Sequence, residues 1–205
     1  MEFDKPLAYR MRPRTLEEYV GQKHILGKDK ILYRTIKADR LSSIILFGPP
    51  GCGKTSLAKV ISETTKYKFE KLNAVTSGVS DIKKVIEDAK NLFLNPTGKC
   101  ILFIDEIHRF NKLQQDALLP AVEDGTIILI GATTENPYFE VNKALISRSM
   151  VFKLEPLSED DILEVLKMAL ERKDGLGEYN IKIDEHTLKT IASISGGDVR
   201  TALMD

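Results

Sequence analysis

Short apolar runs alternate with amphipathic stretches along residues 43–154 of the chain. Five runs predict buried strands: Ser43–Phe47, Phe69–Asn73, Cys100–Asp105, Ile127–Ala132 and Met150–Leu154. Three intervening stretches have apolar residues at helical spacing and predict helices: Lys54–Thr65, Val79–Phe93 and Lys112–Glu123, the last of which Pro120 should bend. Because strands that alternate with helices form parallel sheets covered on both faces, we predict an α/β fold with a five-stranded parallel sheet.

Beyond Pro156 the pattern predicts helices only. Ser158 is placed to cap a helix whose first turn is acidic, and a second helix is expected over Glu185–Ile194. Asp198 is placed to cap a third helix, and the sequence stops about two turns into it. A helical layer this short is not expected to close its own core, which predicts that the chain is a piece of a longer protein.

At the other end of the chain, Thr15-x-x-Glu18 has the spacing of a capping box. It predicts a short helix that ends at Gly21.

Composition narrows the class of protein without identifying it. Hydrophobic residues make up 42% and charged residues 29% of the chain, as in an ordinary globular protein. No apolar run approaches the roughly 20 residues of a membrane helix, and Met1–Arg14 lacks a secretory signal pattern. Two cysteines without a disulfide framework favour a reducing, intracellular setting. Because the sequence has neither a membrane-helix run nor a secretory signal pattern, no membrane partner is expected.

The zero net charge conceals an asymmetry between the two ends of the chain. Residues 1–40 carry ten Lys and Arg against six Asp and Glu, a net charge of +4, so residues 41–205 carry −4. A basic N-terminal stretch suits contact with nucleic acid, and it equally suits a solvated surface.

The segment Gly48–Thr55 carries the first chemical signal. It matches G-x-x-x-x-G-K-[ST] in full, directly after a predicted strand and at the start of a predicted helix. The glycines let backbone N–H groups surround phosphate oxygens, and the helix N-terminus favours negative charge. Lys54 can reach the β- and γ-phosphates of a nucleotide, and the Thr55 hydroxyl is a ligand for Mg²⁺. The match therefore predicts a nucleoside triphosphate site.

Two adjacent carboxylates, Asp105 and Glu106, follow the third apolar run. We expect this strand to lie next to the strand that precedes the phosphate loop, so that both motifs share one edge of the sheet. Asp105 can hold Mg²⁺, and Glu106 can polarise a water for attack on the γ-phosphate. A glutamate in this position favours hydrolysis by water over phosphoryl transfer to a bound substrate.

Three further sites are weaker signals from the residues alone. Thr133 and Thr134 end the fourth strand and could hold the attacking water or form an ordinary turn. Arg148 is either a surface charge or an arginine that reaches the nucleotide of a neighbouring subunit. Arg200, in the first turn of a helix, opposes the helix dipole, which an anionic partner or solvent would offset. The three histidines are too widely spaced for a metal site.

Taken in order, these motifs resemble an AAA+ ATPase. Met11–Gln22 looks like the segment that closes over adenine in clamp loaders and in the RuvB motor. The chain most resembles the RarA/MgsA family of replication-associated recombination ATPases, which is related to the Werner-helicase-interacting protein. This resemblance covers essentially the whole chain and is carried by four segments: Leu7–Pro13, Lys71–Val75, Asp105–Lys112 and Gly131–Pro137.

The resemblance implies a role for each motif. Lys54 and Thr55 form Walker A, Asp105 and Glu106 form Walker B, and Thr134 (or its neighbour Thr133) is sensor 1. Arg148 is implied to be the trans-acting arginine finger, Arg200 to be sensor 2, and Asn73 to be a switch that holds Glu106 until DNA binds. The residues expected to contact ATP are Gly48, Pro49, Pro50, Gly51, Cys52, Gly53, Lys54, Thr55, Ser56, Arg12, Pro13, Tyr19 and Val20.

The resemblance also implies partners and domain limits. DNA is expected to contact Ser77, Gly78, Ser80, Lys83 and Lys84, and the partners of the full-length protein to be replication-fork proteins and further copies of itself. The fragment alone is expected to be largely monomeric. The implied domains are an N-terminal segment (1–42), an αβα core (43–155) and a truncated helical lid (156–205).

Four alternatives to this reading exist, and the sequence argues against two of them, the RuvB-like motor and the kinase. A clamp-loader subunit fits the same motifs. A RuvB-like branch-migration motor would carry a β-hairpin before the sensor 1 strand, and Asp124–Ile130 leave no room for one. A small-molecule kinase would lack the Walker B glutamate. A nucleotide-gated binding module would differ from a motor in turnover rather than in sequence.

Overall fold

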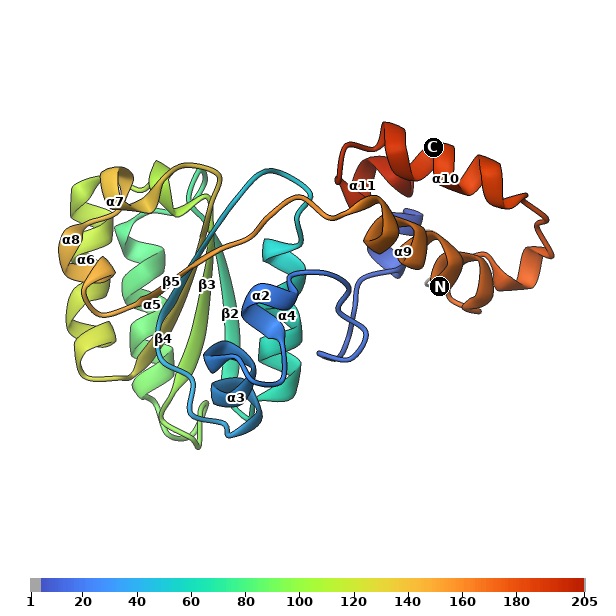
Figure 1. Ribbon diagram of the computed structural model, residues 1–205. Helices are drawn as coiled ribbons and strands as arrows, with labels where there is room; N and C mark the ends of the chain where they lie inside the picture. Colours follow the sequence, from blue (N-terminus) through green and yellow to red (C-terminus); the bar gives the residue numbers. More distant parts are fainter. Residues whose placement is uncertain (1–4, 205) are drawn as a thin grey trace.

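A single parallel sheet forms the centre of the larger part of the molecule. The structure is a computed structural model and describes residues 5–204. The strands are β1 (Ile44–Phe47), β2 (Lys68–Asn73), β3 (Cys100–Asp105), β4 (Ile127–Thr133) and β5 (Met150–Lys153). They pair in parallel in the order β2-β3-β4-β1-β5, so the five-stranded parallel sheet expected from the sequence is confirmed (Figure 1).

The strand order corrects one expectation. β1 and β3 are not neighbours, because β4 lies between them. The Walker A and Walker B segments therefore flank the end of β4, where Thr133 and Thr134 lie. This order places the predicted water-binding hydroxyl between the two motifs that it would serve.

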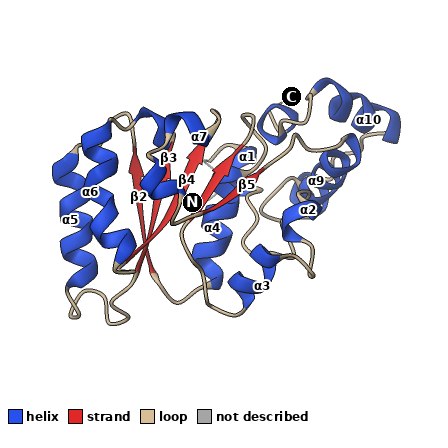
Figure 2. Ribbon diagram, turned by 60° about the vertical axis from the view of Figure 1, so that its left-hand side comes forward, coloured by secondary structure: helices blue, strands red, loops and turns tan. Residues whose placement is uncertain are grey.

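Helices cover both faces of the sheet. The helices in chain order are α1 (Leu7–Arg10), α2 (Lys23–Leu26), α3 (Ile31–Lys37), α4 (Lys54–Thr64), α5 (Val79–Lys90), α6 (Lys112–Glu123), α7 (Pro137–Glu140), α8 (Lys143–Ile146), α9 (Glu159–Glu171), α10 (Glu185–Ile194) and α11 (Val199–Ala202). Helices α3 and α4 pack on one face, and α5 and α6 pack on the other (Figure 2).

The alternation of β3 side chains shows why the sheet is buried on both sides. Ile101 and Phe103 pack with α3 and α4, whereas Leu102 and Ile104 pack with α5 and α6, and all four are at most 1% exposed. Successive strand residues point to opposite faces, so a strand covered on both faces must be apolar throughout. Only its last residue, Asp105, and the following Glu106 leave the core and reach the edge of the sheet.

The helix predicted over Val79–Phe93 is shorter than expected. It ends at Lys90, because the Asn91 side chain accepts a hydrogen bond from the Phe93 N–H (3.0 Å) and begins a turn. Asn95 then holds this turn by donating to the Ala89 carbonyl (2.9 Å). Leu92 and Phe93, which the pattern assigned to the buried stripe, are exposed.

The helix predicted between Thr15 and Gly21 is wrong. The capping contacts do form, since Glu18 N–H donates to Thr15 Oγ1 (3.3 Å) and Arg14 N–H donates to the Glu18 carboxylate (2.9 Å). No helix follows them, because Leu16 and Tyr19 turn into the core beside the phosphate loop. Tertiary packing here overrides a local helix signal.

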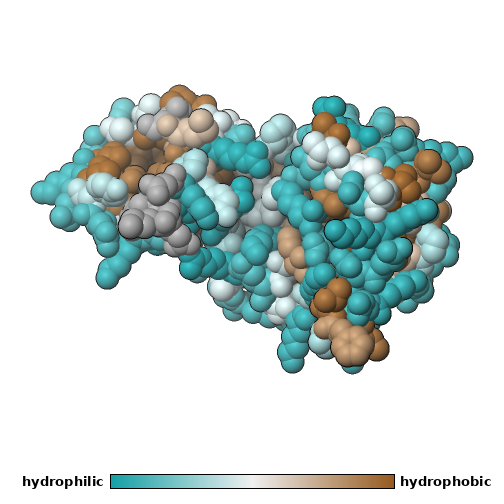
Figure 3. Space-filling view, turned by 180° about the vertical axis from the view of Figure 1, so that it is seen from behind, coloured by the Kyte–Doolittle hydropathy of each residue, from teal (hydrophilic) through white to brown (hydrophobic). Residues whose placement is uncertain are grey.

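The helices after Pro156 form a separate layer, drawn in orange and red in Figure 1. Ser158 caps α9 with a complete capping box, and Asp198 accepts hydrogen bonds from Arg200 N–H (2.7 Å) and Thr201 N–H, as the sequence predicts. The layer has a small core of its own. A space-filling view shows it as a second bulge beside the sheet, with a narrower middle between the two (Figure 3).

The domain limits at 42 and 155 stay predictions, and residues 1–4 and 205 lie outside the described residues. Among residues 5–204, no helix has the length and apolar character needed to cross a membrane.

Candidate nucleotide-binding site

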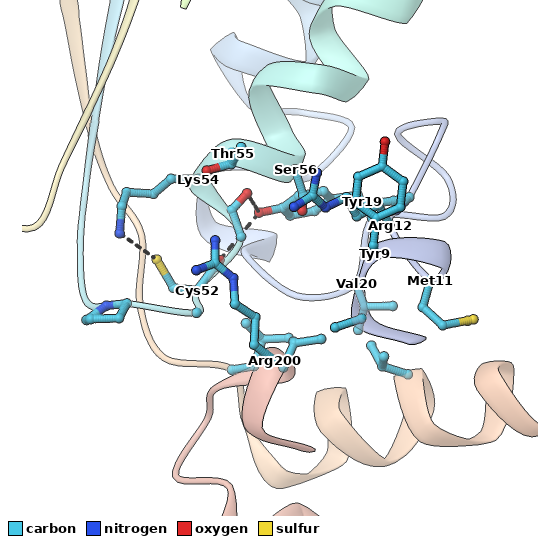
Figure 4. A pocket seen from close by; sticks show the side chains of 18 of the residues that line it. Tyr9, Met11, Arg12, Tyr19, Val20, Cys52, Lys54, Thr55, Ser56 and Arg200 are labelled. Atoms are coloured by element: carbon cyan, nitrogen blue, oxygen red, sulfur yellow. Dashed lines mark hydrogen bonds between the residues drawn. The ribbon is translucent and has the colours of Figure 1, made fainter. Parts of the chain in front are cut away.

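One cavity of about 650 Å³ lies where the phosphate loop, the edge of the sheet, the N-terminal segment and the helical layer meet. Most of the residues predicted to bind a nucleotide line it: Arg12, Pro13, Tyr19, Val20, Pro50, Gly51, Cys52, Gly53, Lys54, Thr55 and Ser56. Asn73, Asp105, Glu106, Thr134 and Arg200 line it as well. Segments far apart in the sequence thus contribute to a single site (Figure 4).

Two glycines of the phosphate loop are required by their surroundings. Gly51 and Gly53 have φ values of +71° and +98°, which side chains rarely adopt. A Cβ at Gly51 would overlap the carboxylate of Asp198, and a Cβ at Gly53 would overlap the Tyr19 hydroxyl. Both the helical layer and the N-terminal segment therefore touch the loop at positions that only glycine permits.

Lys54 lies at the start of α4, as a Walker A lysine does. Its ammonium donates to the carbonyls of Gly48 and Pro49, both at 2.7 Å, and lies 3.7 Å from Cys52 Sγ (Figure 4). Lys54 must exchange these loop contacts to reach a phosphate. Gly48 and Pro49 do not line the cavity, and in this arrangement their carbonyls position the lysine.

Cys52 is buried inside the loop. Burial raises the pKa of its thiol, and the nearby Lys54 ammonium only partly offsets this effect. The thiol is therefore protonated at neutral pH and is unsuited to act as a nucleophile.

The two carboxylates at the end of β3 are each paired with a cation. Asp105 Oδ2 lies 3.5 Å from the Lys71 ammonium, which comes from the neighbouring strand β2. Glu106 Oε2 accepts a hydrogen bond of 2.7 Å from Arg109 Nε. Glu106 has φ +54°, so the chain turns sharply after Asp105 and both side chains stay at the cavity.

The two threonines at the end of β4 occupy different environments. Thr134 is exposed and lines the cavity with Asp105 and Glu106. Thr133 is buried, and its hydroxyl shares a hydrogen bond of 2.8 Å with Nδ1 of His108. The geometry favours Thr134 over Thr133 as the group that can meet a ligand.

Asn73 lines the cavity without contacting Glu106. Its side-chain oxygen accepts a hydrogen bond from the Val75 N–H (2.8 Å) and so stabilises its own loop.

The N-terminal segment closes one side of the cavity. The Tyr19 hydroxyl donates to the Gly53 carbonyl (3.2 Å), and burial raises the pKa of that hydroxyl. Gln22, which we did not predict as a site residue, donates to the carbonyls of Cys52 (3.3 Å) and Glu155 (2.7 Å). It thereby joins the loop to the strand end before the helical layer. Gln22 ends the segment Met11–Gln22 that resembles the part closing over adenine, but no local pattern predicts its two partners.

The helical layer brings Arg200 over the loop. Arg200 follows the cap residue Asp198 at the start of α11, and its side chain rises from this helix toward the loop in Figure 4. Arg200 thus shares the cavity with the phosphate loop residues Gly51, Gly53 and Lys54.

Arg148 lies outside the cavity. Its guanidinium donates to the Ala144 carbonyl (2.9 Å) and to Ser147 Oγ (3.1 Å), and it forms an ion pair with Glu123. The predicted DNA contacts also lie outside the cavity; these are Ser77, Gly78, Ser80, Lys83 and Lys84, at the start of α5.

The lining fits a nucleotide with Mg²⁺. The loop N–H groups precede the 11-residue helix α4, a suitable cradle for phosphates. Thr55 and Asp105 line the same cavity, and Mg²⁺ in such sites needs few protein ligands because phosphates and waters complete its shell. Within residues 5–204 there is no cluster of three or more His, Cys, Asp or Glu side chains that would form an all-protein metal site.

Known proteins are similar to this chain in sequence and in structure. The family description "Holliday junction DNA helicase RuvB P-loop domain" matches residues 11–146. Replication-associated recombination protein A of Escherichia coli strain K12 is 52% identical over 200 residues, which are 97% of this chain and 44% of that protein. The ATPase WRNIP1 of Dictyostelium discoideum is 50% identical over 198 residues, 97% of this chain and 22% of that protein.

Among solved structures, the Thermotoga maritima RuvB Holliday junction branch migration motor superposes with a TM-score of 0.78 at 27% identity. The match covers 95% of this chain and 63% of that one. The chain spans less than half the length of the recombination proteins that it resembles. It therefore belongs to the family of the RuvB P-loop domain, as a nucleotide-binding AAA+ domain of the kind found in replication-associated recombination protein A.

Proposed function

We propose that this chain is the ATP-hydrolysing part of a DNA-remodelling factor that acts at stalled or damaged replication forks. One observation carries the proposal. A single cavity unites the Walker A lysine, the Walker B carboxylates, a strand-end hydroxyl and an arginine from the helical layer. Half-identical relatives named for replication-associated recombination support the DNA-related part of the proposal.

In the proposed reaction, Glu106 accepts a proton as a water oxygen bonds to the γ-phosphorus. The bond from that phosphorus to the β–γ bridging oxygen breaks, which releases ADP and phosphate. Thr134 holds the water, while Lys54 and Arg200 stabilise charge on the phosphoryl oxygens. Thr55 and Asp105 would hold Mg²⁺, which would supply charge neutralisation on the phosphates.

Arg148 is proposed to act on a neighbouring copy. It does not line the cavity beside its own phosphate loop and is partly exposed, which supports a role at the site of another subunit. The active form is therefore proposed to be a homo-oligomer of the full-length protein that binds DNA and other replication-fork proteins in the cytoplasm.

The Glu106→Gln variant tests the proposed hydrolysis. The amide keeps the shape of the side chain and cannot accept the proton, so kcat should fall about 10²–10⁴-fold while nucleotide affinity is retained. Steady-state phosphate release and equilibrium binding of a fluorescent nucleotide measure the two quantities. Lys54→Ala is the matched contrast, because it should weaken binding itself. Turnover of Glu106→Gln near that of the wild type would remove Glu106 from the mechanism.

DNA contact is proposed at the start of α5. Gly78 caps this 12-residue helix, and Lys83 and Lys84 add charge that suits phosphates. The Lys83→Ala/Lys84→Ala variant should lose most of the DNA stimulation of ATPase activity and keep the basal rate. DNA binding should fall with salt and should not depend on base sequence. Unchanged stimulation across single-stranded, duplex and forked DNA would exclude this segment.

A further inference from the structure

A second cavity, of about 410 Å³, adjoins the nucleotide cavity. It lies on the face of the sheet that α4 covers, where the stacked rings of Phe69 and Phe103 line it. Four residues line both cavities: Tyr9, Arg12, Pro13 and Thr55. The loop residues Gly48–Lys54 do not line the second cavity, which is therefore distinct from the phosphate cradle of the nucleotide site.

Cations dominate the lining of the second cavity. Among the described residues, six lysines and arginines line it against two carboxylates; the cations are Lys5, Arg10, Arg12, Arg14, Lys59 and Lys71. Both carboxylates already have a cationic partner within the protein. Glu63 lies 3.2 Å from the Lys59 ammonium, and Asp174 lies 2.6 Å from the guanidinium of Arg172, which does not line the cavity. The lining therefore offers an excess of positive charge to an anion.

The fold gathers this charge from two parts of the chain. Four of the six cations belong to the N-terminal 40 residues, whose net charge is +4. The core adds Lys59 from α4 and Lys71 from β2. The charge asymmetry between the two ends of the chain thus has a definite place in the structure, beside the nucleotide cavity.

Aromatic rings hold several of these cations at the cavity. The Lys5 ammonium and the Arg12 guanidinium lie 4.5 and 4.6 Å from the centroid of the Tyr9 ring. The Lys59 ammonium lies 5.7 Å from the centroid of the Phe69 ring. Cation–π contacts orient a cation without neutralising its charge, so the charge stays available to an anion. Because cations cover these rings, the lining is suited to phosphates rather than to stacked bases.

We propose that the second cavity binds the phosphate groups of a nucleic-acid strand. Its position favours a long polyanion, because Phe69 and Lys71 of the edge strand β2 line it. The end of the same strand leads to α5, where DNA contact is proposed above. A strand that passes this edge of the sheet can contact both places. The inference rests on the proposed binding of DNA and adds a second site to it.

The test is the Lys5→Gln/Lys59→Gln variant of the full-length protein, since both lysines are exposed at the cavity. Loss of two phosphate contacts should lower the slope of log K against log salt by about 1.4 for single-stranded DNA. It should weaken binding up to about 25-fold at about 0.1 M salt. Fluorescence anisotropy of a labelled oligothymidine across a salt series measures both quantities.

Lys167→Gln/Lys189→Gln is the matched control, because it also removes two exposed lysines. Lys189 pairs with Glu185 across one turn of α10 at 3.2 Å, as Lys59 pairs with Glu63 on α4. This control variant should keep the DNA affinity and the salt slope of the wild type.

Lysine acetylation read by mass spectrometry locates the contact without relying on activity. Oligothymidine should protect Lys5 and Lys59 from acetylation and leave Lys189 reactive. Tripolyphosphate is the probe for a small anion. Protection of the two lysines by tripolyphosphate and not by oligothymidine would overturn the assignment to nucleic acid.

Sedimentation velocity tests a different occupant, an acidic surface of a second copy of the chain. Altered assembly of Lys5→Gln/Lys59→Gln with unchanged DNA affinity would overturn the proposal. The wild type separates the two failures. A wild type that binds no DNA refutes the proposed function together with this site, whereas equal DNA binding by the wild type and the variant refutes only the second site.

Discussion

The sheet edge and the helical layer line one cavity, yet they are built very differently. The sheet has buried clusters on both faces, and side chains such as Leu57, Ile101 and Leu129 have no exposed surface. The helical layer has one smaller cluster, centred on Ile162. It approaches the sheet through the connection after β5, where the Leu157 N–H donates to the Gly197 carbonyl (3.2 Å).

The N-terminal segment provides further contacts with the helical layer. Arg10 donates to the carbonyls of Asp174 and Gly175, both at 2.8 Å, and Arg14 lies 3.4 Å from the Asp174 carboxylate. The well-packed sheet and its helices thus support Lys54, Asp105 and Glu106. Arg200 is supported by a layer with only a small core and polar contacts. Regions with fewer buried contacts open locally at lower free energy. We therefore expect the sheet edge to carry the chemistry and the helical layer to control it.

The largest expected effect concerns Arg148, the arginine that a neighbouring subunit would supply to the site at the sheet edge. In the assembled full-length protein, Arg148→Ala should lower kcat about 10³–10⁵-fold without loss of nucleotide binding. Mixing it with Lys54→Ala should restore part of the activity, because an intact site can then use an intact arginine of its neighbour. ATPase assays of the single variants and of the mixture measure this. Fast hydrolysis by the 205-residue chain, independent of protein concentration, would contradict the assignment.

A second experiment addresses the helical layer by itself. Ile162 has no exposed surface, so Ile162→Ala should destabilise the layer by about 2–5 kcal/mol through lost burial and a cavity. Hydrogen exchange should rise in α9–α11 and stay unchanged in the strands, and nucleotide affinity should fall as Arg200 loses its support. An equal rise in exchange in β1, β3 and β4 would show that the two regions unfold as one.

The smallest expected effect concerns the ionic contacts around the helical layer. The Arg172 guanidinium, 2.6 Å from the Asp174 carboxylate, lowers the pKa of that carboxyl. A lowered pKa in the folded state contributes stability above the ordinary carboxyl pKa, and this stability is lost as pH falls through the folded value. Asp174→Asn should therefore cost up to about 1 kcal/mol at pH 7 and progressively less as the pH falls below the ordinary carboxyl pKa and through the lowered pKa of Asp174, measured by denaturant unfolding over a pH series. A cost that does not change with pH would exclude the ionic contribution.

Much of the fold was predictable because its signals are local. The bounds of β3, α6 and α10 agree with the sequence prediction, since apolar periodicity and caps lie within each segment. The phosphate loop is local in the same sense, and its glycines adopt the backbone angles that the motif requires. The predictions failed where a local signal met a stronger competitor. The Asn91 turn ended α5 early, and packing of Tyr19 replaced the helix expected after Thr15.

The sequence by itself therefore determined the parallel strands, the phosphate loop and the two carboxylates that follow β3. Only the tertiary structure decided that β4 separates the two motifs and that Gln22 joins Cys52 to Glu155. The physical reason is the distance along the sequence over which each kind of signal acts. Propensity, periodicity and capping act between residues close in the chain, whereas Gln22 and Glu155 are 133 residues apart. Such a contact forms only when the folded chain brings the N-terminal segment beside the end of β5.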